Sequence, residues 1–485
     1  MAMTRRQFAF TSAGGLSMGG FGAGSAAAAA VRTEGPFSEP MPWDGPAVVR
    51  KVYLSTRRAG WPRPDMDLKQ EIAAIEASLA DFARRHSGAV ELTGGEILYA
   101  AADAPEFLEK AKAADALLAF NMTTGVYPML KPLADSGIPT LLFSLPYAGH
   151  DWTHAAAFAQ KGYRMDVVAS SDYGELDSYS GLFRTIHHLR KSKVLSIAPP
   201  KAKPRTEDYA KQFGTAFAFP TYLDLKAEYD AADTAKAKKA GEDFAKSALK
   251  VIEPAPAEIA DSMRLNAAIL ALMKKEKANA IAIDCLGGFG RKELPAYPCI
   301  AFAKLNDAGC YGVCENDIES TMTQLLVTPF SGKPGFVSDP VFDTSRNEVI
   351  HAHCVSATMM GGIGGTASPF TVRSHLEDHK GVSLMVFPPV GGPCTVARFT
   401  DAKKIMVSTG EVIGNEDNER GCRTKIRTRV KDARKFLAGY AEALNTGPEM
   451  PGTRDLLHRV VFYGDHTLAI ERLGRLLGFK VVMEG

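Results

Sequence analysis

A chain of 485 residues is long enough for about three domains with substantial cores. Its composition, 46% apolar and 23% charged, is that of a globular protein and argues against extended disorder. The 57 basic and 55 acidic residues nearly balance, so the chain has no electrostatic footprint for nucleic acid or for an anionic membrane. We therefore expect neither of these partners, and a small molecule remains the expected ligand.

The first thirty residues carry an expected targeting signal. Arg5 and Arg6 are followed by Phe8 and by a weakly apolar, Gly- and Ala-rich run without acidic residues, which resembles a twin-arginine export signal. A cytosolic leader or a membrane anchor is the alternative, although an anchor would carry more large aliphatic residues. Cleavage near 28–30 would remove both arginines and leave equal numbers of basic and acidic residues. We expect a periplasmic or secreted protein.

Strands alternate with helices over the first two thirds of the chain, which predicts parallel sheets covered by helices. Examples are the apolar strands expected at 116–120, 140–144, 193–198 and 280–284. From about residue 348 short strands separated by Gly and Pro turns predict an antiparallel, barrel-like unit. The expected fold class is α/β, with two Rossmann-like parallel-sheet domains followed by a mixed, barrel-like, β-rich C-terminal domain.

We expect five segments along the chain. They are a signal peptide (1–30), a linker (31–46), an N-terminal α/β domain (47–176), a second α/β domain (177–347) with Glu315 and Asp339, and the C-terminal domain (348–485) with His353 and His466.

Acids and histidines gather between Cys310 and Cys354. Glu315 and Asp339 stand at expected element ends, and carboxylates combined with imidazole suit a divalent cation such as Mn²⁺. Spacing alone leaves other roles open, because a Glu at a helix start can serve the helix dipole and an Asp before Pro is typical of a turn. His351 and His353 alternate along one strand and therefore share a face.

The seven cysteines all lie in the second part of the chain and include no C-x-x-C pair, which argues against a zinc ribbon or a thioredoxin-type site. Buried, apolar packing is the expected role for most of them, and an oxidising compartment leaves one or two disulfides open.

Several short motifs resemble the L-fucose isomerase-like family, which includes L-fucose and L-arabinose isomerases. They are Cys314-Glu315-x-Asp317, Leu325-Leu326, Ser331-Gly332-Lys333-Pro334, Asp339, His353-Cys354 and Gly464-Asp465-His466-Thr467. The domain order agrees over nearly the whole chain, whereas the specific motifs cover about 310–354 and 460–483. Val355-Ser356-Ala357 stands where the family often has a proline.

The resemblance implies a site and a reaction. It places a Mn²⁺-type ion on Glu315, Asp339 and His466, with His353 as a less certain ligand and Asp317 behind them. The implied activity is an aldose–ketose isomerisation of a monosaccharide through an enediol, with Glu315 and Asp339 as the catalytic acids. The resemblance also implies a homo-oligomer, a trimer or a hexamer.

Two other functions stay open. The chain could be a non-catalytic periplasmic sugar-binding protein built on two α/β domains, or it could catalyse a different metal-dependent reaction on a sugar. The residues alone do not name the sugar.

Overall fold

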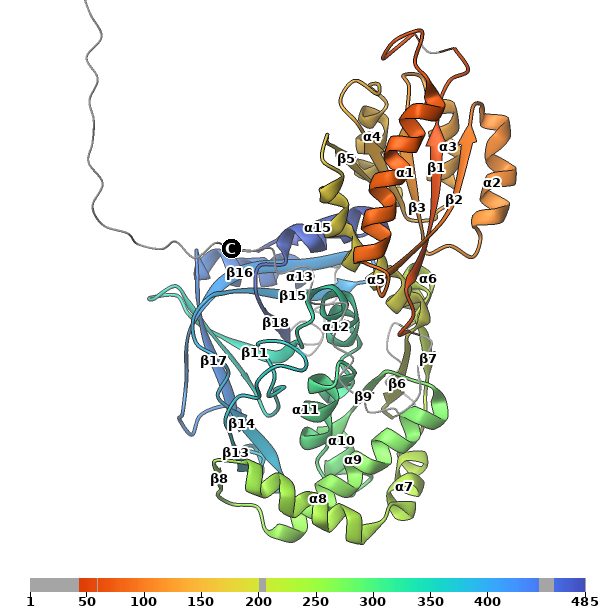
Figure 1. Ribbon diagram of the computed structural model, residues 1–485. Coiled ribbons are helices and arrows are strands. Elements are labelled where there is room, and N and C mark those ends of the chain that lie inside the picture. Colours follow the sequence, from red (N-terminus) through yellow and green to blue (C-terminus); the bar gives the residue numbers. More distant parts are fainter. Residues whose placement is uncertain (1–42, 59, 200–205, 445–457, 485) are drawn as a thin grey trace, which may run out of the picture.

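The computed structural model describes residues 43–58, 60–199, 206–444 and 458–484. The expected signal peptide and most of the expected linker lie outside these residues. The chain forms two parallel sheets and a closed barrel, and the first sheet with its helices stands away from the other two parts (Figure 1). Among the described residues no helix is both long and apolar enough to cross a bilayer. The predicted fold class is confirmed.

The first domain is a five-stranded parallel sheet with strand order β2-β1-β3-β4-β5. Its central strands β3 and β4 are mostly apolar and every residue in them is buried, as expected for a sheet covered on both faces. In chain order its elements are β1 (Ala47–Leu54), α1 (Leu68–Arg85), β2 (Val90–Leu98), η2 (Ala101–Asp103), α2 (Ala104–Ala111), β3 (Ala116–Asn121), α3 (Tyr127–Asp135), β4 (Thr140–Ser144), α4 (Trp152–Gln160), β5 (Met165–Ala169) and η3 (Tyr173–Leu176).

The second domain is a four-stranded parallel sheet with order β10-β9-β6-β7. Its elements are α5 (Asp177–Lys191), β6 (Lys193–Ile197), α6 (Thr206–Phe213), β7 (Ala216–Ala218), α7 (Tyr222–Ala231), α8 (Thr234–Ser247), α9 (Pro256–Glu276), β9 (Ala280–Ile283), α10 (Cys285–Gly290), α11 (Cys299–Asp307), β10 (Tyr311–Val313), η4 (Cys314–Asn316) and α12 (Ile318–Ser331). Ligands of such sheets bind beyond the carboxyl ends of the strands, and β10 delivers Cys314 and Glu315 to that edge.

The barrel consists of six antiparallel strands and closes because β15 pairs with both β18 and β16. Around the barrel the order is β15-β18-β11-β12-β17-β16, and β19 adds to β16 in parallel. Its elements are β11 (Phe336–Asp343), β12 (Glu348–His353), β15 (Pro393–Asp401), β16 (Lys404–Asn415), β17 (Thr424–Val430), α13 (Ala433–Leu444), β18 (Arg459–Tyr463), α15 (Thr467–Leu477) and β19 (Lys480–Met483).

Two expectations about this region need correction. Residues 336–343 were expected in the second domain, but they form β11, whose Pro340 masks the strand pattern, and Asp339 is therefore a barrel residue. The short strands after residue 348 were all expected in the barrel-like unit, but β14 (Ser383–Val386) lies outside the barrel. It joins β13 (Phe370–Arg373) and β8 (Lys250–Val251) in a separate small sheet. Arg373 fixes this small sheet to the second domain through a bidentate pair with Glu253 at 2.5–2.9 Å.

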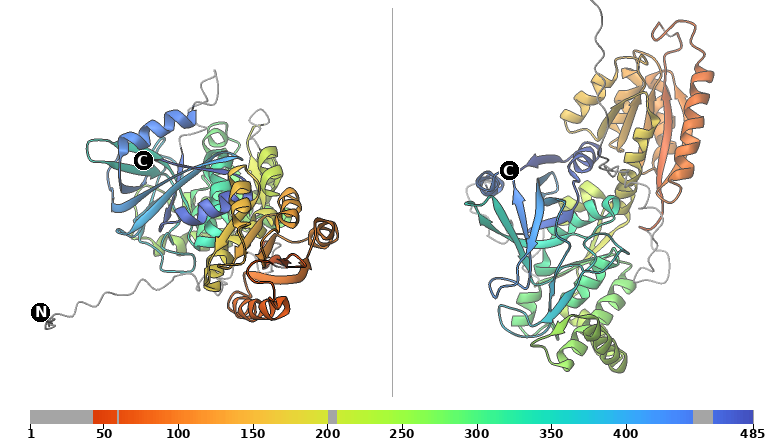
Figure 2. Two further views of the ribbon diagram at one scale, coloured as in Figure 1. Left: turned by 90° about the horizontal axis from the view of Figure 1, so that it is seen from above. Right: turned by 60° about the vertical axis from the view of Figure 1, so that its left-hand side comes forward.

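Helix α12 lies between the barrel and the second sheet and contacts β10, β15, β18 and α5 (Figures 1 and 2). One apolar cluster includes Phe183 of α5, Met322 of α12 and Phe399 of the barrel. The first domain reaches the same cluster through Phe120. Because the core is continuous, the N-terminus of α12 is held at a fixed place between β10 and the barrel. That place is where the acids and histidines meet.

Candidate metal centre

Glu315 lies directly after β10 in a strained backbone conformation. Its φ is 56°, and the φ of the next residue, Asn316, is 52°. The left-handed region is costly for residues with a side chain and is frequent at functional sites. The Oδ1 of Asn316 accepts a hydrogen bond of 2.8 Å from Ser196 at the end of β6, which holds the turn against the sheet. The turn aims the Glu315 carboxylate away from its own sheet and toward two histidines of the barrel.

His353 and His458 are the two barrel histidines that face Glu315. The Nε2 atom of His353 lies 3.9 Å from Glu315 Oε1, and the Nε2 atom of His458 lies 3.8 Å from Glu315 Oε2. The rings meet edge to face, with centroids 5.1 Å apart. Asp339 of β11 completes the group, because its Oδ1 lies 3.4 Å from His458 Nε2. We call Glu315, Asp339, His353 and His458 the acid–histidine site.

Three atoms of this site are buried and have no hydrogen-bond partner among the described residues: Asp339 Oδ1, His353 Nε2 and His458 Nε2. Leaving a buried polar atom unpaired costs about 1–3 kcal/mol, and native structures rarely keep three such atoms together. Donors bound to one cation at about 2.1 Å lie roughly 3–4 Å from one another, which agrees with the distances above. The unpaired atoms therefore have the arrangement of ligands around one divalent cation.

The four side chains of the acid–histidine site differ in how deeply they are buried. Those of His353 and His458 are 2% and 3% exposed, whereas those of Glu315 and Asp339 are 28% and 27% exposed. The histidines thus form the closed back of the site and the two carboxylates its accessible front. Burial raises the pKa of Glu315, the two histidines oppose that rise, and Asp339 adds to it. Glu315 is therefore closer to neutrality than an ordinary glutamate and can both accept and release a proton.

Asp317 lies behind His458 and fixes its orientation. Its Oδ2 is 2.7 Å from His458 Nδ1, and it also accepts a hydrogen bond from the buried Arg398 of β15. Its Oδ1 accepts from the backbone N–H of Ser320 and so caps α12. Burial alone would disfavour the Asp317 carboxylate, but Arg398 and His458 outweigh burial and hold its pKa far below the usual range.

This network selects the tautomer of His458. An ionised carboxylate only accepts hydrogen bonds, so Nδ1 of His458 carries the proton that faces Asp317. In a neutral ring Nε2 then presents its lone pair to Glu315 and Asp339. Carboxylate–histidine–metal arrangements of this kind are frequent behind bound cations. The predicted place of Asp317, behind the ligands, agrees with this geometry.

His353 has a different partner on its far side. Its Nδ1 lies 3.3 Å from the sulfur of Cys354. Burial disfavours the charged ring, but Cys354, Asp339 and Glu315 raise the pKa of His353 to about 10. A cation at Nε2 would compete with a proton for this ring.

His466 does not join this group. It precedes α15, its Nε2 lies 3.0 Å from the backbone oxygen of Tyr463, and its ring packs edge to face on Phe330. Burial and the nearby Lys333 lower its pKa. The tight turn at Gly464, with φ of 109°, directs the ring back toward its own strand. The structure thus brings together three of the four predicted ligands and places His458 where the sequence suggested His466.

His458 was missed because its position depends on strand register. It directly precedes β18, and β18 pairs with β11 such that Ser338 lies opposite Arg459. The neighbours of that pair, Asp339 and His458, consequently lie side by side. A histidine at the start of an expected strand was the available signal, but nothing in the sequence states which strand lies beside it.

The described residues contain a second group that could hold a cation, formed by Cys314, His353 and Cys354. One ligand atom from each lies within 4.8 Å of the others, and all three residues are buried. The described residues therefore contain two donor sets of different chemistry, Glu315 with His353 and His458, and Cys314 with His353 and Cys354, each of which could hold a metal ion.

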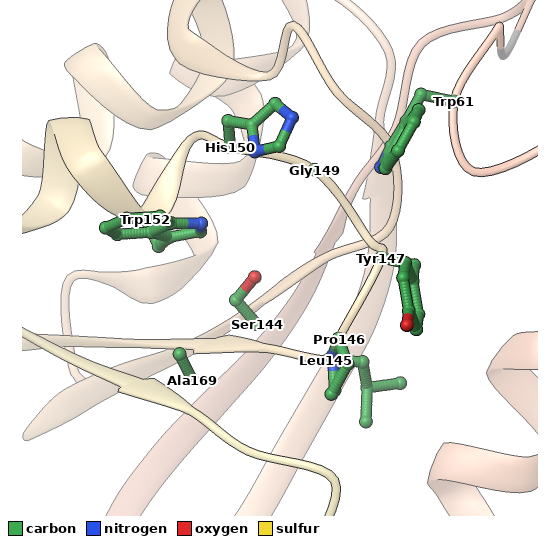
Figure 3. Close-up of a pocket in the computed structure, with 9 residues that line it drawn as sticks. All are labelled: Trp61, Ser144, Leu145, Pro146, Tyr147, Gly149, His150, Trp152 and Ala169. Atoms are coloured by element: carbon green, nitrogen blue, oxygen red, sulfur yellow. The ribbon is translucent and has the colours of Figure 1, made fainter.

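A separate pocket of about 290 Å³ lies at the carboxyl edge of the first sheet (Figure 3). Trp61, Tyr147 and Trp152 border it and are 40%, 76% and 42% exposed. Gly149 in its loop has φ of 156°, and a Cβ there would come within 2.9 Å of the Thr124 backbone, so the loop requires glycine. We call this the aromatic pocket; it shares no residue with the acid–histidine site.

Comparison with known proteins gives no family. No protein-family model matches the chain, and no curated protein matches it. Among solved structures, an ABC transporter solute-binding protein from Burkholderia multivorans is 13% identical and has a TM-score of 0.18. The match covers 52% of this chain and 85% of that one. A similarity this low bears on neither the fold nor the function of the chain.

Proposed function

We propose that the protein is a metal-dependent aldose–ketose isomerase-like enzyme that acts on a monosaccharide through an enediol intermediate. The observation that carries this proposal is the convergence of three unpaired buried donor atoms, from Asp339, His353 and His458, on the carboxylate of Glu315. Two carboxylates with two imidazoles suit Mn²⁺ or a similar divalent cation.

The division between front and back supports this reaction. His353 and His458 hold the cation from the buried side, while Glu315 and Asp339 also face the accessible side, where a substrate would lie. When bound, the cation would withdraw electron density from adjacent sugar oxygens and so acidify the neighbouring C–H bond. The chain's own contribution is a pair of carboxylates placed to move protons.

In the proposed reaction one carboxylate takes the proton from carbon 2 of an aldose and a proton returns to carbon 1. The hydroxyl proton of oxygen 2 passes to oxygen 1, so that the carbonyl moves from carbon 1 to carbon 2 without any external oxidant or reductant. Glu315, whose pKa burial raises, is the better proton carrier of the pair. Asp339, whose Oδ1 lies 3.4 Å from His458 Nε2, is the second carboxylate of the pair.

A panel of pentoses, hexoses and deoxysugars tests the proposal, assayed for ketose formation with Mn²⁺ and with a chelator. We expect turnover of at least one sugar, abolished by the chelator and by Glu315→Gln or Asp339→Asn. Asp343→Asn is the matched control, since Asp343 lies on the same strand as Asp339 but pairs with surface residues Ser345 and Arg346. Turnover that withstands both the chelator and the two active-site variants would contradict the proposal.

A second candidate function, sugar binding without catalysis, is favoured by the aromatic pocket. Its exposed aromatic rings suit the apolar faces of a sugar ring, and Ser144 and His150 in its lining suit the hydroxyls. Two of the three tryptophans of the chain, Trp61 and Trp152, border this pocket, so intrinsic fluorescence reports on it. Fluorescence changes with sugars that are never turned over would favour this function over the isomerase.

A further inference from the structure

Four cysteines from four separate elements meet behind His353. Cys354 directly follows β12, Cys314 begins η4, Cys299 begins α11 and Cys285 begins α10. The sulfur of Cys354 contacts those of Cys299 and Cys314, and the sulfur of Cys314 also contacts that of Cys285. All four side chains are buried, and all four thiols are free. We call these four residues the thiol cluster.

The thiol cluster is directed at a nitrogen that the acid–histidine site does not use. His353 faces Glu315 with Nε2, whereas Nδ1 of the same ring lies 3.3 Å from Cys354. Cys314 and Glu315 are adjacent in sequence, but Cys314 belongs to the thiol cluster and Glu315 to the acid–histidine site. Two donor sets therefore stand back to back, and the imidazole of His353 separates them.

We propose that Cys314, Cys354 and Nδ1 of His353 form a second metal site, selective for a thiophilic ion such as Zn²⁺ or Cu⁺. Thiolate and imidazole donors select such ions, while the carboxylates on the other face of the ring select Mn²⁺-type ions. The separation of 3.3 Å between nitrogen and sulfur fits two donors that share one ion at about 2.0 and 2.3 Å. Binding at this site releases the protons of the two sulfurs and of His353 Nδ1 to solvent. His353 can hold a cation on each of its nitrogens only as an imidazolate, after the ring has lost both protons.

Cys299 and Cys285 complete the surroundings of this site. Cys299 contacts Cys354 and Cys285 contacts Cys314, so either could supply a fourth ligand, which would be the third sulfur. The buried imidazole of His375 also interacts with Cys354, beside apolar residues such as Val355. A buried surround of sulfur and imidazole groups favours the binding of a soft cation.

Buried cysteines also serve as small apolar side chains, so packing alone is the competing explanation. Cys394 provides the comparison: it is fully buried in a different apolar cluster inside the barrel, where its neighbours are apolar. If the thiol cluster only packs, its cysteines will behave toward metals as Cys394 does.

Titration of the reduced, full-length protein with Cd²⁺ tests the proposal, because thiolate-to-cadmium charge transfer absorbs in the ultraviolet while carboxylate and imidazole ligands give no such band. We expect a band that saturates at one ion per chain, persists in Asp339→Asn and in Cys394→Ser, and is lost in Cys314→Ser and in Cys354→Ser. Persistence in Asp339→Asn separates this result from the fate of the proposed isomerase site.

Protection of wild-type thiols provides a measurement that needs no variant. Zn²⁺ should slow the alkylation of Cys314 and Cys354 by at least tenfold, measured by peptide mass spectrometry, and should leave Cys394 unaffected. The proposal is overturned by the absence of both the cadmium band and the protection, by a band that survives the Cys314→Ser, Cys354→Ser double variant, or by a Cys314–Cys354 disulfide in the isolated protein.

Discussion

His353 and His458 each direct Nε2 at the carboxylate side of the site, but their Nδ1 atoms contact different kinds of group. Behind His458 lies an ionised carboxylate, Asp317, which is itself held by Arg398. Behind His353 lies the sulfur of Cys354, within a cluster of thiols. A carboxylate fixes the tautomer of a histidine strongly, whereas sulfur is a weak acceptor and is itself a metal ligand. The comparison suggests that the His458 half is built for rigidity and the His353 half for a second, softer cation.

We expect the largest loss of Mn²⁺ affinity from a substitution in the His458 half of the site. His458→Gln should weaken Mn²⁺ binding by more than about 100-fold, because it removes a ligand whose orientation the protein has already fixed. His466→Gln is the control, since the His466 ring hydrogen bonds to the backbone oxygen of Tyr463 and lies outside the site. Isothermal titration of both variants measures the difference. An equal loss of Mn²⁺ affinity in the two variants would contradict the assignment of His458, rather than His466, as the metal ligand.

Asp317→Asn should have the next largest effect. The amide keeps the shape but removes the charge that faces Arg398, so the free energy of unfolding should fall by roughly 3 kcal/mol. The affinity for Mn²⁺ should fall by about 10- to 100-fold, because His458 loses the acceptor that sets its tautomer. Denaturant unfolding and metal titration measure the two effects. Asp343→Asn, on the barrel surface, should change neither.

Cys354→Ala should weaken Mn²⁺ binding less than Asp317→Asn does, by under about tenfold, because sulfur is the weaker partner of an imidazole. The two variants measured side by side test directly whether the two halves differ. An effect of Cys354→Ala as large as that of Asp317→Asn would remove the distinction between them.

The smallest expected effect is a pH dependence of the apo protein. Because the pKa of Asp317 is lowered in the folded state, its contribution to stability is complete above the unfolded pKa of about 3.9 and declines as the pH falls below that value. The stability difference between wild type and Asp317→Asn should therefore narrow on acidification. Urea unfolding of both proteins from pH 6 to pH 3 checks the trend, and a constant difference would contradict the assigned ionisation.

Much of the fold was predictable because the pattern is local. Apolar runs such as Ala116–Asn121 and Ala280–Ile283, with helices between them, suffice to predict parallel sheets. Strand β11 was harder, since its sequence Ser338-Asp339-Pro340 looks like a turn, and only its pairing with β12 and β18 makes it part of the barrel.

Some residues of the site could likewise be predicted from the sequence, and others could not. Glu315, Asp339 and His353 stand out as acids and a histidine near expected element ends. His458 does not, because its role arises from the register of β18 against β11, which no sequence pattern records. The contacts among Cys285, Cys299, Cys314 and Cys354 likewise depend on the meeting of elements that are up to 69 residues apart in sequence.

The most direct test of the central claim is a Mn²⁺ titration of the metal-free protein, followed by the electron paramagnetic resonance of the free ion. The account predicts one tightly bound ion per wild-type chain, the same in Asp343→Asn, and none in the Glu315→Gln, Asp339→Asn double variant. Undiminished binding in the double variant, or no binding in the wild type, would contradict it.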